Sequence, residues 1–239
     1  MSELAFTAFS LNGVDAQKFL QGQVTVHVER LALNESRYTA ICDLKGRIHF
    51  GLWIKKLNTE SFELVTTHDQ AEEFAKHIKK FGAFSKMKLE EIGSVFPTIH
   101  GIQTEFSSNE TDIYTWQIEA IKSGQAWISK TTEHLFQPQE LRLHQRDGVH
   151  FDKGCYLGQE IIARLYFKAS PKAWLHRVAG TGDIPNAGEK IGNVDVVNSI
   201  ATDTGFEALV VGRPDDIAAS NLTILELPQA LQQPVARQH

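Results

Sequence analysis

Cysteine and positive charge are both scarce in this chain of 239 residues. The two cysteines, Cys42 and Cys155, cannot form a disulfide framework, and so few thiols indicate a reducing compartment. Lysine and arginine total 24 against 29 acidic residues, which leaves a formal net charge of -5. This is the wrong sign for a protein whose main work is to neutralise nucleic-acid phosphates, although a local basic groove stays possible.

Long apolar runs are missing as well. The sequence has no stretch of about 18 apolar residues, and its start, MSELAFTAFS, lacks the basic beginning and apolar centre of a signal peptide. We therefore expect a cytoplasmic protein without a membrane span. The hydrophobic share of 42% and the charged share of 22% are typical of a globular chain with a buried core, and the length suggests one or two domains.

Common catalytic and metal-binding motifs are also absent. The sequence has no C-x-x-C pair, no H-E-x-x-H, no G-x-S-x-G and no Walker loop. Its ten histidines are scattered without the spacing of metal ligands, so we predict no metal site.

The hydrophobic pattern of the first half predicts a mixture of strands and helices. Residues 37–43 and 47–55 have strand character on either side of a tight turn, which predicts a hairpin. Residues 71–81 carry apolar side chains at helical spacing, so we predict a helix that is capped by Asp69 and buries a stripe ending at Phe81.

The second half is predicted to contain shorter elements. Residues 93–115 are polar and irregular and form either a connection or a short hairpin, and residues 116–123 predict a short helix with Thr115 as its cap. After Pro171, short strand-like runs separated by turn residues indicate a small antiparallel barrel or sandwich. The residues from Gln229 onward are expected to be a loose tail.

Residues 152–160 bring two glycines, a cysteine and a lysine close together in the sequence. Gly154 and Gly158 permit positive φ angles or a close backbone approach, and Cys155 lies between them. A helix N-terminus and the nearby Lys153 would both favour the thiolate form of this cysteine. The alternative is a buried structural thiol in a glycine turn, since free cysteines are often buried.

Several blocks of this sequence resemble, in order, those of one family. They are Phe19-Leu20-Gln21-Gly22-Gln23-Val24-Thr25, Cys42-Asp43-Leu44-Lys45-Gly46-Arg47, the expected strand Phe84-Ser85-Lys86, the helix from Trp116 to Gly124, Pro138-Gln139-Glu140-Leu141 and Lys153-Gly154-Cys155-Tyr156-Leu157-Gly158-Gln159-Glu160. The last block is similar to the signature K-G-C-Y-x-G-Q-E of the YgfZ family, folate-binding relatives of the glycine-cleavage T-protein, an aminomethyltransferase.

The resemblance implies an α+β fold like that of the T-protein. Its N-terminal body, residues 1–168, would be a ferredoxin-like mixed α/β region that binds folate, with a middle domain shortened to residues 93–115. Residues 169–239 would form a small C-terminal β-barrel. The implied function is an accessory role in assembling or repairing iron–sulfur enzymes, which would affect tRNA modification indirectly through a tRNA methylthiotransferase. Direct tRNA binding is not expected.

The resemblance also assigns roles to individual residues. Cys155 would be the functional thiol, and Phe6 and Trp116 would form the walls of a pterin site for tetrahydrofolate or a derivative. Lys153 would tune the thiol or meet the glutamate tail of folate, and Arg164 would meet that tail or form only a surface ion pair. The other signature residues would shape or anchor the loop; they are Gly154, Tyr156, Gly158, Gln159 and Glu160.

Two departures from the family pattern bear on activity. The strand Ile48-His49-Phe50-Gly51 lacks the carboxylate that aminomethyltransferases carry after the turn, so glycine-cleavage activity is not expected. Lys122 replaces an acidic residue of the family's helix. Two alternatives to the accessory role remain. They are a folate-dependent one-carbon transferase, which the missing carboxylate argues against, and a non-catalytic scaffold or RNA-contacting module, which Lys122 favours.

Overall fold

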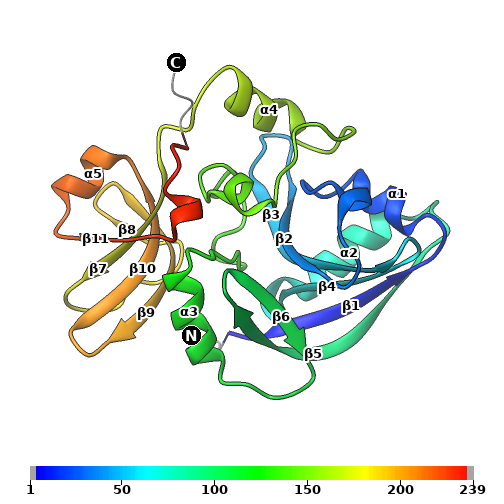
Figure 1. Cartoon of the computed structure of the whole chain (residues 1–239), viewed down its shortest axis with the longest axis horizontal. Coiled ribbons are helices and arrows are strands. Elements are labelled where there is room, and N and C mark those ends of the chain that lie inside the picture. The colour runs from blue at the N-terminus through cyan, green and yellow to red at the C-terminus, as the bar shows by residue number, and fades with distance from the viewer. Residues whose placement is uncertain (1–3, 236–239) are drawn as a thin grey trace.

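The computed structural model describes residues 4–235, and Figure 1 shows two sheets side by side with few helices. The N-terminal sheet has the strand order β2-β3-β4-β1-β5-β6. Its strands are β1 (Phe6–Asn12), β2 (Ser36–Cys42), β3 (Ile48–Asn58), β4 (Ser61–Thr67), β5 (Lys88–His100) and β6 (Gln103–Ser107).

The C-terminal sheet has the strand order β11-β7-β10-β9-β8. Its strands are β7 (Trp174–Gly180), β8 (Lys190–Ile191), β9 (Val194–Thr202), β10 (Gly205–Gly212) and β11 (Thr223–Leu225). The α-helices are α1 (Ala16–Gln21), α2 (Ala71–Phe81), α3 (Ile113–Lys122), α4 (Gln159–Phe167) and α5 (Pro214–Ala219). Within residues 4–235, no helix is both long and apolar enough to cross a membrane.

Strand β1 shows why the N-terminal sheet is buried on both faces. Phe9 and Leu11 belong to a core that includes buried residues of α1 and α2. Phe6 and Ala8 belong to a different core, which extends to α3 and to residues of the C-terminal sheet. Because successive side chains of a strand point to opposite faces, one apolar strand serves both cores.

The predicted hairpin and long helix are confirmed. Strands β2 and β3 pair antiparallel, and α2 spans Ala71–Phe81 as the spacing indicates. Two details were wrong. Phe81 is 51% exposed, because it lies at the last turn of α2, beyond the sheet. Asp69 does not cap the helix; it lies in a short 3-10 helix, η2 (His68–Gln70), and accepts a hydrogen bond from the backbone N–H of Lys130.

The block Phe84-Ser85-Lys86 is not a strand. It lies in the turn between α2 and β5, and the side chain of Phe84 is fully exposed. For residues 93–115 the sequence allowed either a connection or a short hairpin. The structure shows the hairpin, because β5 continues to His100 and pairs with β6. Helix α3 then begins before Trp116, and its cap is Asp112 instead of Thr115. The Asp112 carboxylate accepts from the N–H groups of Tyr114 and Thr115.

Residues 229–235 pack against the body of the protein. It forms a short 3-10 helix, η4 (Gln229–Leu231), and the Leu231 side chain is buried. The guanidinium of Arg142 donates hydrogen bonds to the carbonyls of Leu175 and Leu231, at 2.9 and 2.7 Å. The expectation of a loose tail was therefore wrong for these residues, because a buried arginine ties them to the start of β7.

Candidate functional site

The signature loop is locked against the first hairpin turn by a glycine. Gly158 caps α4 at its N-terminus with a φ of 80°. A Cβ atom at this position would lie 2.3 Å from the backbone oxygen of Asp43 and 3.0 Å from Cα of Gly46. Glycine is therefore required at residue 158 for two reasons, the left-handed backbone and the close approach of the turn.

Lys153 anchors the same loop to a second segment. Its side chain is buried, and its ammonium donates a hydrogen bond to the carbonyl of Val24, in the Gln-Gly-Gln-Val-Thr block. The same nitrogen lies 4.7 Å from the ring centre of Tyr156, which is a cation–π distance. Burial lowers the pKa of Lys153 to about 7. Lys153 therefore anchors the loop through a buried contact. Its ammonium is not at the surface, where it could contact the glutamate tail of folate.

The structure separates the two cysteines. Cys42 is buried at the end of β2, and burial, followed by the nearby Asp43 carboxylate, raises its pKa well above the ordinary value. Cys155 is exposed, between the buried side chains of Lys153 and Tyr156. The alternative of a buried structural thiol therefore applies to Cys42 and is excluded for Cys155.

Asp43 organises the turn that receives Gly158. Its carboxylate accepts hydrogen bonds from the backbone N–H groups of Lys45 and Arg47, at 2.8 and 3.0 Å, and lies 3.0 Å from Nδ1 of His134. Partial burial acts to raise the pKa of Asp43, but these hydrogen bonds outweigh it and hold the pKa below the ordinary value. The ionised carboxylate keeps the turn in the shape that the signature loop packs against.

Phe6 and Trp116 meet, but not as two walls of an open site. Both are buried, and their ring centres lie 5.2 Å apart at an interplanar angle of 83°. The Trp116 indole N–H donates to the hydroxyl of Thr104 at 3.2 Å. An edge-to-face contact leaves no room for a flat ring between the two side chains. The two rings therefore cannot enclose a pterin between them in this geometry, and their role in folate binding stays a prediction.

A cavity of about 590 Å³ lies beside this aromatic core, between the two sheets. It is lined by Leu4, Ala5, His68, Asp69, Gln117, Trp127, Ser129, Thr131, Ile184, Pro185, Asn186, Ala187, Asn198 and Ser199. The volume is in the range of sites for small molecules, which often lie between domains. Ala5 and Gln117, the chain neighbours of Phe6 and Trp116, reach the cavity, whereas the aromatic rings do not.

Trp127 is the aromatic side chain that lines this cavity. Its ring centre lies 5.1 Å from that of Trp116, and both tryptophans are buried, so the two rings pack on each other. The buried side-chain amide of Asn198, on β9, accepts from the Trp127 backbone N–H and donates to its carbonyl, both at 3.0 Å. Trp127 could not be predicted as a cavity residue, because nothing in its local sequence distinguishes it from a core tryptophan.

The remaining predicted residues surround α4. Arg164 is exposed on α4 and lines a surface hollow of about 640 Å³ together with Glu160, Phe167 and Lys168. Gln159 lies at the first turn of α4, where its side-chain amide is 3.4 Å from the carbonyl of Lys153. Figure 1 shows α4 at the top of the molecule and α3, which carries Trp116, near the bottom. Arg164 and Trp116 therefore do not contribute to one site.

One group of side chains was missed altogether. His49, Glu73 and Glu133 each offer a ligand atom, and these atoms lie within 4.8 Å of one another. The three residues are far apart in the sequence, so no spacing could reveal them. The prediction of no metal site did not consider this arrangement.

Comparison with known proteins points to one family. No protein-family model matches the chain. It is 26% identical to the tRNA-modifying protein YgfZ of Photorhabdus laumondii, over 92% of this chain and 89% of that protein. The same named protein of Colwellia psychrerythraea is 29% identical over 70% of this chain and 67% of its own length.

Two further comparisons agree with this result. An uncharacterized protein of Haemophilus influenzae is 30% identical over 70% of this chain and 68% of its own length. The solved structure of the glycine-cleavage aminomethyltransferase T of Bartonella henselae matches with a TM-score of 0.63 at 11% identity, over 87% of this chain and 76% of that one. The expected T-protein-like fold is confirmed by this structural likeness.

Proposed function

The chain belongs to the YgfZ family and shares its link to tRNA modification, and from this premise we propose that it is a folate-binding accessory protein for assembly or repair of iron–sulfur enzymes. Such enzymes include tRNA methylthiotransferases, so its effect on tRNA would be indirect. The net charge of -5 favours a protein partner over direct tRNA binding.

The observation that carries this proposal is the exposed thiol of Cys155 on an anchored loop. Lys153 binds the carbonyl of Val24, and Gly158 lies against Asp43, so segments from three parts of the sequence hold the loop in place. The neighbours Lys153 and Tyr156 are buried, which leaves the thiol as the accessible reactive group between them. This arrangement presents one thiol to a partner in a defined position.

We propose that Cys155 acts on a cluster that belongs to the partner. A cluster usually needs four protein ligands, and Cys42 is buried and cannot add a second thiolate beside Cys155. The thiol of Cys155 would ligate one corner of the cluster transiently while the partner supplies the other ligands. The cluster is then a substrate in transit and not a resident cofactor.

The cavity beside Trp127 is the proposed folate site. A pterin is flat and carries hydrogen-bonding groups along its edge, and the cavity is lined by Trp127 together with polar residues such as Asp69 and Gln117. Phe6 and Trp116 would act through Trp127, by supporting its ring. Their earlier assignment as direct walls is replaced by this supporting role.

The folate proposal is tested by calorimetric titration of the full chain with tetrahydrofolate. Wild type should show saturable binding, and Trp127→Ala should weaken it at least tenfold. Trp174→Phe is the matched control, because Trp174 lies on β7 and does not line the cavity. Absence of binding to wild type, or equal binding by Trp127→Ala, would remove the folate site from the proposal.

The thiol proposal is tested by complementation in a strain that lacks the gene. Wild type and Cys42→Ser should restore methylthiolated nucleosides in tRNA, measured by mass spectrometry, and Cys155→Ser should not. Full restoration by Cys155→Ala would overturn the role of this thiol. Equal amounts of soluble protein, checked in the same extracts, ensure that the comparison reports function.

A further inference from the structure

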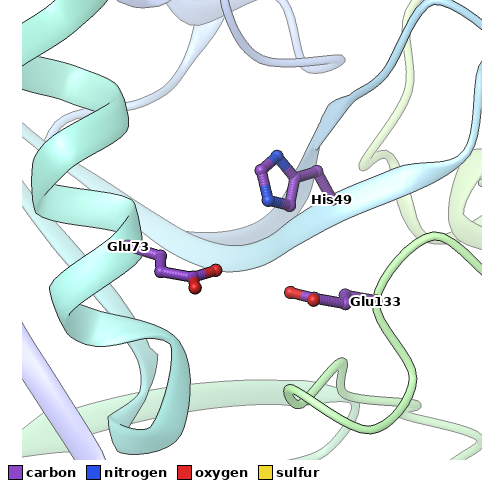
Figure 2. Close-up of side chains that lie close together, drawn as sticks. All are labelled: His49, Glu73 and Glu133. Atoms are coloured by element: carbon purple, nitrogen blue, oxygen red, sulfur yellow. The ribbon is translucent and has the colours of Figure 1, made fainter.

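Three side chains from distant segments converge on one space beside β3. His49 lies on β3, Glu73 on α2 and Glu133 on the loop that follows α3, and Figure 2 shows the two carboxylates and the imidazole turned toward one another. One ligand atom of each lies within 4.8 Å of the others. This is one imidazole nitrogen and two carboxylate oxygens on the edges of a common gap.

A buried amide adjoins this group and has an unused acceptor. Gln70 is fully buried, and its side-chain N–H group donates to the carbonyl of His49 at 2.9 Å and lies 3.4 Å from a Glu133 oxygen. Its side-chain oxygen is buried and has no hydrogen-bond partner among residues 4–235. A buried acceptor without a donor is costly, and such atoms are often completed by an ion or a water.

The carboxylates of Glu73 and Glu133 share one cationic partner, the ammonium of Lys130. The ammonium of Lys130 forms ion pairs with Glu73 and with Glu133, the latter at 3.0 Å. The Lys130 side chain is 42% exposed, so it can swing into water, and exposed ion pairs of this kind contribute little to stability. The negative charge of the pair is therefore available to a cation of higher charge.

We propose that His49, Glu73 and Glu133 bind a divalent transition-metal ion, which displaces the ammonium of Lys130. An imidazole favours zinc, iron, nickel and related ions over magnesium and calcium, and the two carboxylates complete a set of three protein ligands. Such bonds are about 2.0–2.2 Å long, so the three ligand atoms must lie within about 4.4 Å of one another when the ion is bound. Glu73 is half exposed and can rotate to close the gap.

Neighbouring groups are placed to orient these ligands. The N–H group of Gln70 contacts Glu133, and the ring of His49 stacks on that of His134 with a centre-to-centre distance of 4.3 Å. His134 in turn lies 3.0 Å from the Asp43 carboxylate, at the turn that receives Gly158. Contacts of this kind fix the orientation of metal ligands in other proteins. The proposed ion would thus lie near the signature loop without using Cys155.

The experiment measures metal binding by the full chain and does not depend on the folate or thiol proposals. Protein stripped with a chelator is titrated with Zn²⁺ by calorimetry and with Co²⁺ by absorption, in a Cys155→Ser background that removes the exposed thiol as a ligand. One ion should bind per chain. His49→Ala and Glu73→Gln should each weaken binding at least tenfold, and Lys130→Met should strengthen it severalfold.

Glu72→Gln is the matched control, because Glu72 is an exposed neighbour on the same helix and pairs with Lys76. It should leave the affinity unchanged. Circular dichroism and urea unfolding of each variant show whether it folds, and Glu73→Gln, at an exposed position, supplies the result if His49→Ala does not fold. No stoichiometric binding by the Cys155→Ser parent, or equal binding by this parent and its Glu73→Gln variant, would overturn the proposal.

Discussion

Gly158 lies so close to Asp43 that a single added carbon would sit 2.3 Å from the Asp43 carbonyl oxygen. This contact joins the Lys-Gly-Cys-Tyr-x-Gly-Gln-Glu signature to the turn between β2 and β3, more than one hundred residues earlier in the chain. The position of the Cys155 thiol therefore depends on the shape of a hairpin turn as well as on its own loop. The predictions below test this and other contacts that place the site.

Gly158→Ala should destabilise the protein by about 2–4 kcal/mol, because alanine adds both left-handed strain and a clash with backbone atoms. Urea unfolding followed by circular dichroism measures the change. Gly154→Ala is the control in the same loop, since a Cβ at residue 154 would meet no atom within 4 Å. Equal stability of the Gly158 variant and wild type would show that the loop does not pack against the turn.

The buried amine of Lys153 should make stability depend on pH in the alkaline range. Its pKa falls from 10.5 to about 7 on folding because of burial, so between these values the unfolded chain holds a proton that the folded chain has released. The free energy of unfolding of wild type, compared with Lys153→Met, should rise by up to about 1.4 kcal/mol per pH unit from pH 7 toward pH 10.

Urea unfolding at pH 6, 7.5 and 9 measures this difference. Lys168→Met is the matched control, because Lys168 is exposed at the end of α4 and should show no such trend relative to wild type. A constant difference between wild type and Lys153→Met over this range would mean that Lys153 stays charged inside the fold.

Acid should destabilise the protein through its half-buried histidines. Burial lowers the pKa values of His77, His144 and His176 to about 4, from 6.5 in the unfolded chain. Between pH 6.5 and 4 these histidines are therefore protonated in the unfolded chain and neutral in the folded chain. Because the unfolded chain binds more protons, the free energy of unfolding falls as the pH falls. His144→Gln should reduce this loss by about 1 kcal/mol per pH unit.

Thermal or urea unfolding between pH 7 and 4.5 measures the effect. His100→Gln serves as the control, because His100 is exposed at the end of β5. Identical pH dependence of wild type and His144→Gln would contradict the assignment of a neutral, buried imidazole at residue 144.

The contact between β9 and the segment that follows α3 should depend on Asn198. Its amide makes two hydrogen bonds to the backbone of Trp127, and Asn198→Ala would leave a buried N–H and a buried carbonyl without partners. We expect a loss of about 2–4 kcal/mol in the free energy of unfolding. We also expect weaker binding of any ligand in the cavity that Trp127 lines.

Asn193→Ala, at an exposed position before β9, should change stability by less than about 0.5 kcal/mol. Urea unfolding of both variants makes the comparison. A small effect at residue 198, similar to that at residue 193, would show that the backbone of Trp127 is held by other contacts.

The β2–β3 hairpin and α2 could be predicted from the sequence, because the patterns that predict them lie within a few neighbouring residues. The β2–β3 hairpin follows from strand-forming residues around a glycine turn, and α2 follows from apolar spacing that ends at Gly82. The exposure of Phe81 could not be predicted from the sequence. Periodicity shows which side chains share one face of α2, but not where the surface that covers this face ends. Phe84 was wrongly placed in a strand because its block resembles a strand of the family, whereas here it lies in the turn between α2 and β5.

The sequence by itself determined the family blocks and the chemical character of the residue 152–160 loop, and it predicted that Cys155, and not Cys42, is the functional thiol. Only the tertiary structure decided that Cys155 is exposed, that Lys153 is buried against Val24, and that Phe6 and Trp116 pack on each other. It also brought together His49, Glu73 and Glu133. The physical reason is the same in each case: residue type and spacing act over a few residues, whereas burial and contact depend on which distant segments fill the space around a side chain.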